Sequence, residues 1–332
     1  MKNSIIYLTP AGATLPSVRF RVLPFVELGK ARGLDISWER VPKSIFKRLS
    51  FFASLPKADI YIIQAKLFSK TEINILKCKC GMLAFDYDDA VWTLPPFDLS
   101  NPKKKRKADK SARRFANQCA KAELCIAGNN FLAAKGANYQ DNIAVIPTGL
   151  DTKKYTMKRQ DSPVSAPLVG WMGTSSYLDW VQEPISRLQQ HIGSIQFSII
   201  SNAQYTGVGK DNVMYAAWSS ENEVAQLQAM DIGLMPLEDS EYSCGKCGFK
   251  ILQYMACGVV PVAADVGFNT EIIEHGKDGF LVSNPDEWTE HVMRLAEDPE
   301  LRKNMAEAAR KKVVAQFDIR VMADALWRAL GV

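Results

Sequence analysis

The sequence has no long uninterrupted hydrophobic run. A helix that crosses a bilayer needs about 20 predominantly apolar residues, and no stretch of these 332 residues approaches that length. The N-terminus instead enters a short strand-like segment at Ile5–Leu8, without the pattern of a secretory leader. We therefore expect a soluble, unprocessed protein.

Cysteine is sparse and odd in number. The seven cysteines are scattered along the chain, unlike those of a small disulfide-stapled domain, so we expect reduced thiols and a cytoplasmic location. Cys244 and Cys247 have the spacing of half a zinc site. The other close pair, Cys78 and Cys80, has the wrong spacing and no histidine lies nearby, so we expect no bound metal.

Two common nucleotide-binding motifs are missing. The loop after the first expected strand offers only Gly12 instead of G-x-G-x-x-G, and the chain contains no G-x-x-x-x-G-K-[ST]. These absences remove the main support for a dinucleotide-dependent dehydrogenase and for a P-loop enzyme.

Short apolar runs alternate with amphipathic stretches throughout the chain, six of them between Ile5 and Ile146 and six between Leu168 and Val282. This alternation is typical of parallel strands joined by crossover helices. The length exceeds that of a usual single core, and the composition, 47% hydrophobic and 23% charged, is ordinary for a globular protein. The sequence predicts an α/β fold with two doubly wound domains.

The pattern is interrupted at Pro147-Thr148-Gly149, and a polar segment with Pro163 and Pro167 follows before the next apolar run. We predict an N-terminal domain over 1–160 and a C-terminal domain over 161–317. A break at Gln316–Asp318, where Asp318 can cap a helix, predicts a last amphipathic helix over 318–332.

Five segments carry further information: CGKCGFKILQYMACGVVPVAADVG at Cys244–Gly267, NTEIIEHGKDGFLV at Asn269–Val282, VIPTGLDTKKY at Val145–Tyr155, FDYDDAVW at Phe85–Trp92 and SVRFRV at Ser17–Val22. Together they resemble glycosyltransferase family 4, the retaining enzymes of glycosyl transferases group 1.

This resemblance implies the GT-B fold, in which two Rossmann-like domains face each other across a cleft. It also implies a nucleotide-sugar donor of UDP or GDP type on the C-terminal domain and an acceptor on the N-terminal one. The last helix packs back on the N-terminal domain in such relatives, although its sequence fits either domain. The nucleotide-sugar is a substrate, and no metal or other cofactor is implied.

The strongest candidate for donor binding is the segment Gly245–Lys250. A departing nucleoside diphosphate develops negative charge, which a metal-free enzyme must stabilise with fixed cations and helix N-terminal amides. Gly245, Lys246, Gly248 and Lys250 precede or open a helix expected over Phe249–Cys257. The alternative is a surface loop with two solvated lysines.

The family's E-x7-E motif is altered at both ends, with Gly245 at the first position and Gln253 at the second. The resemblance gives Gln253 the ribose hydroxyls, which an amide can bind as donor and acceptor. Gly173 and Thr174 replace a basic residue of many relatives. They can offer amides and a hydroxyl to phosphate, or form an ordinary capped turn. Glu271 is a cleft candidate that would also stabilise a first helical turn without any function.

Candidates on the acceptor side come from the first half. Asp88 and Asp89 end a strand, and they are candidates for the cleft rather than for a D-x-D metal site; loop hydrogen bonding is the alternative. With Lys250 they form the predicted catalytic set. Arg19 and Arg21, near the start of the first helix, can meet an anionic substrate or be structural.

Residues 103–114 hold eight Lys or Arg. Solvated charge is the simplest interpretation, and peripheral contact with an anionic membrane at the inner face is the rival. The aromatic residues are not interleaved and the net charge is only +5, so we do not expect nucleic-acid binding.

Together these features predict a hexosyltransferase-like enzyme that moves a sugar from a nucleotide-sugar to a glycan, lipid-linked or small-molecule acceptor. The alternatives are a sugar epimerase of the same fold and a catalytically weak sugar-nucleotide-binding partner protein. All three histidines lie in the second half, so none is available as a first-domain catalytic base.

Overall fold

The computed structural model describes residues 4–158, 166–191 and 193–332, which form two compact units. The first unit comprises Met1–Gly149, Ser240–Cys247 and Ile319–Val332, and the second comprises Leu150–Asp239 and Gly248–Asp318. The predicted boundary between 160 and 161, with Pro163, lies outside the described residues. Each unit is described below by itself.

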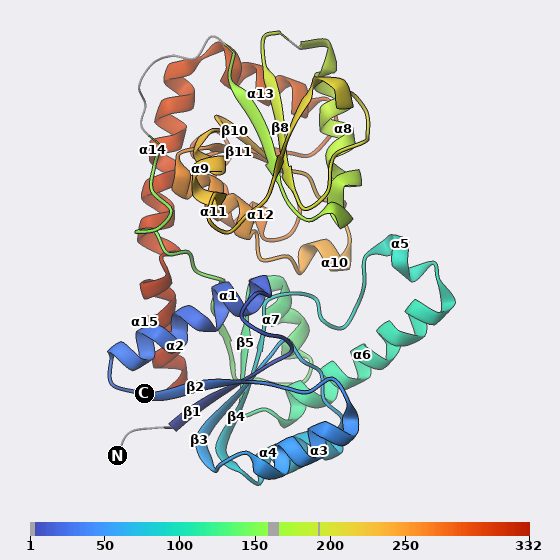
Figure 1. Cartoon of the computed structure of the whole chain (residues 1–332), viewed down its shortest axis with the longest axis vertical. Helices are drawn as coiled ribbons and strands as arrows, with labels where there is room; N and C mark the ends of the chain where they lie inside the picture. Colours follow the sequence, from blue (N-terminus) through green and yellow to red (C-terminus); the bar gives the residue numbers. More distant parts are fainter. Residues whose placement is uncertain (1–3, 159–165, 192) are drawn as a thin grey trace. The chain divides into compact units, whose positions relative to one another are not determined.

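The first unit is built on a six-stranded parallel sheet with the order β2-β1-β3-β4-β5-β6 (Figure 1). Its strands are β1 (Ser4–Thr9), β2 (Asp35–Arg40), β3 (Ala58–Gln64), β4 (Cys80–Tyr87), β5 (Leu124–Ala127) and β6 (Ile143–Val145). Its helices are α1 (Pro16–Arg21), α2 (Leu23–Ala31), α3 (Ile45–Ser54), α4 (Lys70–Lys77), α5 (Pro96–Leu99), α6 (Pro102–Lys121), α7 (Asn130–Ala137), α10 (Glu241–Cys244) and α15 (Ile319–Leu330).

The second unit repeats this plan with the strand order β12-β11-β10-β7-β8-β9. Its strands are β7 (Leu168–Met172), β8 (Gln196–Ser201), β9 (Val213–Ala217), β10 (Ile232–Met235), β11 (Val260–Ala264) and β12 (Phe280–Val282). Its α-helices are α8 (Leu178–Leu188), α9 (Glu223–Gln228), α11 (Phe249–Cys257), α12 (Asn269–Ile272), α13 (Glu287–Glu297) and α14 (Pro299–Gln316), and its 3-10 turns are η1 (Ser175–Tyr177), η2 (Gln189–His191) and η3 (Lys210–Asn212).

The predicted α/β class with two doubly wound sheets is confirmed. The six apolar runs expected in each half correspond to the six strands of each sheet, among them Leu124–Ala127 and Ile232–Met235. All four residues of each run are buried, because helices cover both faces of a parallel sheet and leave no polar side to the strand.

The C-terminal helix α15 belongs to the first unit, where it lies beside α2 (Figure 1). The Trp327 ring is 2% exposed and meets the Phe25 ring edge to face, with 6.3 Å between the ring centroids. Gly29 of α2 permits this approach, because a Cβ at that position would lie 3.2 Å from the Trp327 ring. The helix therefore completes the core of the first unit on one face of its sheet.

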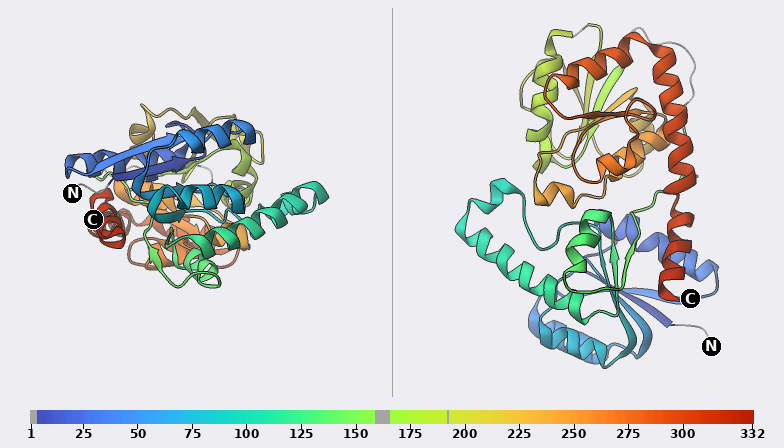
Figure 2. Two further views of the ribbon diagram at one scale, coloured as in Figure 1. Left: turned by 90° about the horizontal axis from the view of Figure 1, so that it is seen from below. Right: turned by 180° about the vertical axis from the view of Figure 1, so that it is seen from behind.

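The basic run predicted between Lys103 and Arg114 forms most of α6, whose N-terminal half projects from the sheet with α5 (Figure 2). The helix contacts the unit mainly through Phe115, Gln118 and Cys119, which are buried near its C-terminal end. Among the described residues, no helix combines the length and the hydropathy that crossing a membrane requires.

Removal of the Trp327 side chain should destabilise the first unit. We expect Trp327→Ala to lower the free energy of unfolding by about 3–5 kcal/mol, because it leaves a large cavity between α15, α2 and the sheet. The control is Val321→Ala on the same helix, where the side chain is 38% exposed and the change should stay within about 0.5 kcal/mol. Urea denaturation of both variants measures the difference, and equal losses would contradict this packing.

Candidate functional site

The direction in which successive strands are added to the second sheet reverses between β7 and β10. The chain runs from β7 to β8 and β9 on one side and from β10 to β11 and β12 on the other. Only the first parts of β7 and β10 pair, through Ile232 with Val169 and Gly233 with Gly170. In open parallel sheets, the carboxyl ends of two such diverging strands are where ligands bind.

Tyr254 of α11 holds these two strands at the point where their pairing ends. Its hydroxyl accepts a hydrogen bond from the Met172 amide at 3.0 Å and donates one to the Leu234 carbonyl at 3.3 Å. Burial raises the pKa of Tyr254, so the hydroxyl remains a donor at neutral pH. A Cβ at Gly233 would lie 2.6 Å from this ring, so glycine is required beneath it.

Helix α11 starts at this position and brings two of the predicted donor residues together. Gly248 precedes it in the left-handed conformation, with φ of 58°, and a Cβ there would lie 2.3 Å from the Ile272 side chain. Lys250 is the second residue of the helix. Its Cε atom would lie 3.1 Å from a Cβ on Gly173, the residue that follows β7. A cation, a helix N-terminus and a glycine loop thus meet at the carboxyl ends of the strands.

The segment after Gly173 forms the 3-10 turn η1, and the Thr174 side chain that precedes it makes no capping hydrogen bond. The Thr174 carbonyl accepts from the Tyr177 amide, and the Ser175 amide donates to the Asn202 side chain at 2.8 Å. The Thr174 side chain is exposed. The turn is therefore held by its own hydrogen bonds, and the predicted phosphate contacts of Thr174 stay a prediction.

Gln253 lies in a buried polar network that the sequence did not reveal. Its side-chain amide, 2% exposed, donates to the Tyr155 hydroxyl at 3.2 Å and to the Glu223 carboxylate at 3.1 Å. Tyr155 donates to the same carboxylate at 2.7 Å, and the Trp218 indole donates to it at 3.4 Å. Glu223 on α9 thus places beside Gln253 the carboxylate that the family resemblance expects at position 253 itself. The predicted ribose contact of Gln253 stays a prediction.

Glu271 lies in the first turn of α12 and is exposed. This placement agrees with the helix start expected from the sequence. Its predicted contact with the donor stays a prediction as well.

The segment Ser240–Cys247 groups with the first unit, although the predicted C-terminal domain 161–317 included it. The Asn129 side chain donates to the carbonyls of Cys244 and Lys246, both at 3.1 Å, and the Trp92 indole donates to Glu241 at 2.9 Å. The predicted donor segment Gly245–Lys250 is therefore divided between the two units after Cys247.

Gly245 is fixed by packing. A Cβ at this position would lie 2.5 Å from the Ala90 Cβ and 2.8 Å from the Ala90 amide nitrogen. Any larger side chain would have to displace the main chain after β4. This close contact gives a physical reason for the absence of the family's first glutamate.

Lys246 and Asp89, both predicted site residues, lie together in the first unit. Their charged atoms are 3.5 Å apart, and the Lys246 ammonium also donates to the Tyr242 hydroxyl at 2.9 Å. The same ammonium lies 4.2 Å from the centroid of the Tyr242 ring. Part of the positive charge expected for a phosphate is thus balanced by Asp89.

For Arg21 the sequence left a substrate contact and a structural role open, and the residue lies fully buried in the first unit. Its Nε atom donates to both oxygens of Asp86 at 2.8 and 3.0 Å, and its Nη1 donates to the Thr148 hydroxyl at 3.2 Å. The structure therefore gives Arg21 a structural ion pair, because the buried Asp86 at the end of β4 requires a neighbouring cation.

Asp88 is connected to this pair through weak contacts of 3.5 Å with Thr148 and Gln64. Burial raises the pKa of Asp86 to about 6, and Arg21 opposes that rise. Burial disfavours the charged guanidinium, but the carboxylates of Asp86 and Asp88 raise the pKa of Arg21. Each member of the pair thus favours the ionised form of the other. Arg19, partly exposed, lies against the neighbouring Phe20 ring.

A pocket of about 440 Å³ lies at the carboxyl ends of β10, β11 and β12. Its lining includes the carboxylates Asp179, Glu183, Glu238, Asp239 and Asp265. None of the predicted donor residues lines it, and its negative charge disfavours a diphosphate. Within the described ranges, no group of three or more His, Cys, Asp or Glu side chains is arranged to hold a metal ion.

Residues 200–312 match the family model described as glycosyl transferases group 1, which confirms the predicted family resemblance at that level. A curated relative, the N-acetyl-alpha-D-glucosaminyl L-malate synthase of Bacillus anthracis, is 34% identical over 110 residues. That match covers 32% of this chain and only 27% of the relative.

Solved structures resemble the whole chain. Anabaena HepE in complex with UDP and glucose has a TM-score of 0.72 at 15% identity, and the match covers 99% of both chains. Sucrose-phosphate synthase from Thermosynechococcus elongatus has the same TM-score and identity, with 98% of this chain and 99% of that one covered. These likenesses confirm the predicted GT-B fold.

Loss of the Arg21 guanidinium should leave the buried Asp86 carboxylate without its cation. We expect Arg21→Met to lower the free energy of unfolding by about 3–5 kcal/mol and the additional change Asp86→Asn to recover part of it. The control is Arg32→Met, which removes half of an ion pair whose side chains are 51% and 62% exposed, and should cost less than about 1 kcal/mol. If urea denaturation gives the same loss for both arginines, Arg21 is not the structural cation described here.

Restoring the family's glutamate at 253 should destabilise the second unit at high pH. Gln253→Glu places a second carboxylate against buried Glu223, which raises the carboxyl pKa of the pair. A raised pKa favours the protonated form, so the destabilisation should be large at about pH 8 and fade toward about pH 5. Melting temperatures at both values measure this, with exposed Gln204→Glu as the control. A difference from wild type that does not change with pH would contradict the Glu223 contact.

Proposed function

We propose that this chain, which has the GT-B fold and matches glycosyl transferases group 1 over residues 200–312, is a retaining glycosyltransferase. The donor is a nucleotide-sugar of UDP or GDP type. The acceptor is a glycan, a lipid-linked molecule or a small molecule.

The observation that carries this proposal is the position of Lys250. It lies at the N-terminus of α11 and close to Gly173. This position is at the carboxyl ends of β7 and β10, the two strands between which the strand order of the second sheet reverses. A departing diphosphate would meet an ammonium group, helix amides and a loop without side chains. This arrangement supplies positive charge from the chain itself, so we propose that the reaction needs no metal cofactor.

The structural relatives support the choice of donor class. HepE has been solved with UDP, with UDP and glucose, and with UDP-glucose. Because those likenesses are at 14–16% identity, they support a nucleotide-sugar and leave the sugar and the base to experiment.

The remaining site residues take roles within this proposal. We assign Lys250 to the diphosphate, with Gly173, Thr174 and Lys246 as further phosphate contacts, and Glu271 to the donor. We assign Gln253 to the ribose side of the nucleotide, where its amide would act together with Glu223. Asp88, Asp89 and Arg19 remain the candidates for the acceptor and for catalysis. We propose a cytoplasmic location, with the basic part of α6 as a peripheral contact with anionic membranes.

Lys250→Ala tests the donor site. We expect it to weaken UDP binding roughly ten- to a hundredfold, because a charge-assisted hydrogen bond is worth about 1.5–3 kcal/mol. Calorimetry with uridine, UMP and UDP should show that the variant loses most of the affinity gained from the phosphates. The control is Lys277→Ala, which removes an exposed lysine of the same unit that pairs with Glu274.

The same protein preparations also test the enzymatic activity. The assay measures whether the sugar of UDP-glucose or GDP-mannose is hydrolysed or transferred to an acceptor. If the folded Lys250→Ala variant binds both UDP and GDP like the wild type, this loop does not bind the donor. Binding of a nucleotide without turnover of any nucleotide-sugar would favour the binding-protein alternative.

A further inference from the structure

A cluster of cations lies at the carboxyl edge of the first sheet and includes Arg114, the last residue of the basic run on α6. Lys66 follows the end of β3, and Lys43 lies in the loop after β2. Ala65, directly before Lys66, has a φ of 52°, a left-handed conformation that is unfavourable for a residue with a side chain. The main chain thus accepts local strain where it presents Lys66, as is common at binding sites.

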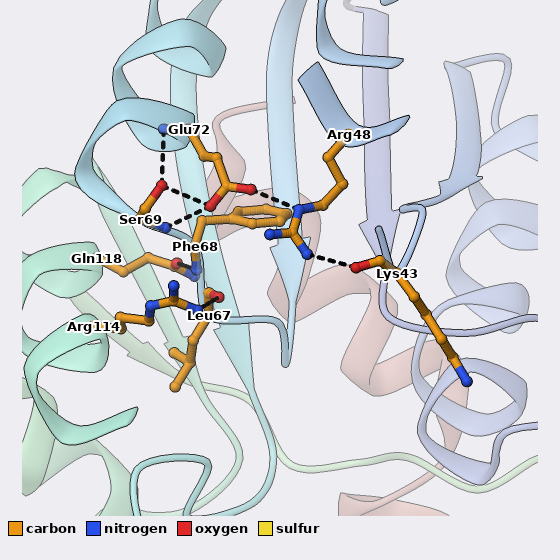
Figure 3. A network of polar contacts seen from close by, with 8 residues as sticks. All are labelled: Lys43, Arg48, Leu67, Phe68, Ser69, Glu72, Arg114 and Gln118. Atoms are coloured by element: carbon orange, nitrogen blue, oxygen red, sulfur yellow. Dashed lines mark hydrogen bonds and ion pairs between the residues drawn. The ribbon is translucent and has the colours of Figure 1, made fainter. Parts of the chain in front are cut away.

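The loop that carries Lys66 is held rigidly by Gln118 of α6 (Figure 3). Its side-chain oxygen accepts from the Phe68 amide at 2.9 Å, and its amide group donates to the Lys66 carbonyl at 2.8 Å. Ser69 and Glu72 then cap α4 reciprocally. The position of Lys66 is therefore defined by the fold.

Two arginines flank this loop. Arg48 of α3 donates to the Glu72 carboxylate at 2.6 Å and to the Lys43 carbonyl at 3.1 Å. Arg114 of α6 donates to the Leu67 carbonyl at 3.5 Å. Figure 3 shows both guanidiniums directed toward the segment from Leu67 to Glu72, from opposite sides.

The positive charge of this cluster exceeds what the fold needs. Arg48, Lys66 and Arg114 carry three positive charges, and the carboxylate that pairs with Arg48 is Glu72. That carboxylate already accepts from the Ser69 amide and hydroxyl as well as from Arg48. Glu72 is thus satisfied by Ser69 and Arg48, and the charges of Lys66 and Arg114 are additional.

The cations act on one another. Burial lowers the pKa of the Lys66 ammonium, and the charges of Arg48, Arg114 and Lys43 lower it further, while Glu72 opposes them. Concentrated like charge at a half-buried position costs stability. A multiply charged anion would remove that cost, and guanidiniums match the geometry of phosphate oxygens.

We propose that Arg48, Lys66 and Arg114 form a binding site for the phosphate group of a phosphorylated ligand. If the chain is a glycosyltransferase as proposed above, on which this step rests, that ligand is the acceptor. The phosphate belongs either to a soluble molecule or to a lipid, and both present the same group to the cluster.

Two variants, Lys66→Gln and Arg114→Gln, test the site by removing one positive charge each. The control is Lys30→Gln, an exposed lysine in the last turn of α2, outside the basic run of α6. The probes are inorganic phosphate, titrated by calorimetry with UDP present at saturation, and vesicles of phosphatidylcholine with and without phosphatidic acid. Melting temperatures without ligand establish that each variant is folded.

We expect each cluster variant to weaken binding of one of the two probes by about tenfold or more, with Lys30→Gln like the wild type. This pattern with inorganic phosphate identifies a soluble phosphorylated ligand. The same pattern only with vesicles that contain phosphatidic acid identifies a lipid-borne phosphate. Equal behaviour of all three variants with both probes would overturn the proposal.

UDP affinity separates this proposal from the proposed function. Lys66→Gln and Arg114→Gln should bind UDP like the wild type, because the donor residues lie in other elements. UDP binding without any phosphate response of the cluster would refute the phosphate site alone. A phosphate response in a protein that binds no nucleotide would leave the phosphate site standing and remove the donor assignment.

Discussion

The hydroxyl of Tyr254 is the contact on which the candidate donor site depends. Parallel strands that diverge leave amides and carbonyls unpaired at their ends, and buried groups of this kind must find partners. One phenol meets this requirement for both β7 and β10, through Met172 and Leu234. Because Tyr254 is part of α11, the same contact fixes the position of that helix relative to β7 and β10. The positions of Gly248 and Lys250 follow from it.

The departures from the family's glutamate motif have structural explanations in this chain. At 245 the main chain approaches Ala90 so closely that no side chain fits. At 253 the amide of glutamine is complementary to the buried carboxylate of Glu223, which a second glutamate would repel. Each substitution is thus matched by a neighbour that is distant in sequence, so the altered motif is compatible with a well-formed site.

The first unit contains two groups of charges with opposite consequences. Arg21 and Asp86 are buried and balanced, with the guanidinium bound to both carboxylate oxygens, so this pair serves the fold. The cluster around Lys66 is half-buried and holds more cations than carboxylates. Its positive charges repel one another and lower the pKa of Lys66. A buried pair of opposite charges is typical of a structural role. Uncompensated positive charge at the edge of a sheet instead favours the binding of an anionic ligand.

The sequence by itself determined the two sheets, the approximate positions of their strands, the start of α11 and the family resemblance. These features depend on local signals: apolar runs covered on both faces, glycines at special conformations and a contiguous motif. Runs such as Leu124–Ala127 are too apolar to be anything but buried, and Phe249–Cys257 could be bounded by the glycines on either side.

Only the tertiary structure decided which distant residues meet. The sequence left both a substrate contact and a structural role open for Arg21. The side chain pairs with Asp86, 65 positions away, and Gln253 meets Glu223 from another helix. The grouping of Ser240–Cys247 with the first unit depends likewise on Asn129 and Trp92. Such pairings follow from how helices pack against a sheet, and no periodicity in the chain encodes the partner. The fold was therefore readable from local pattern, whereas the roles of single charges depended on long-range contacts.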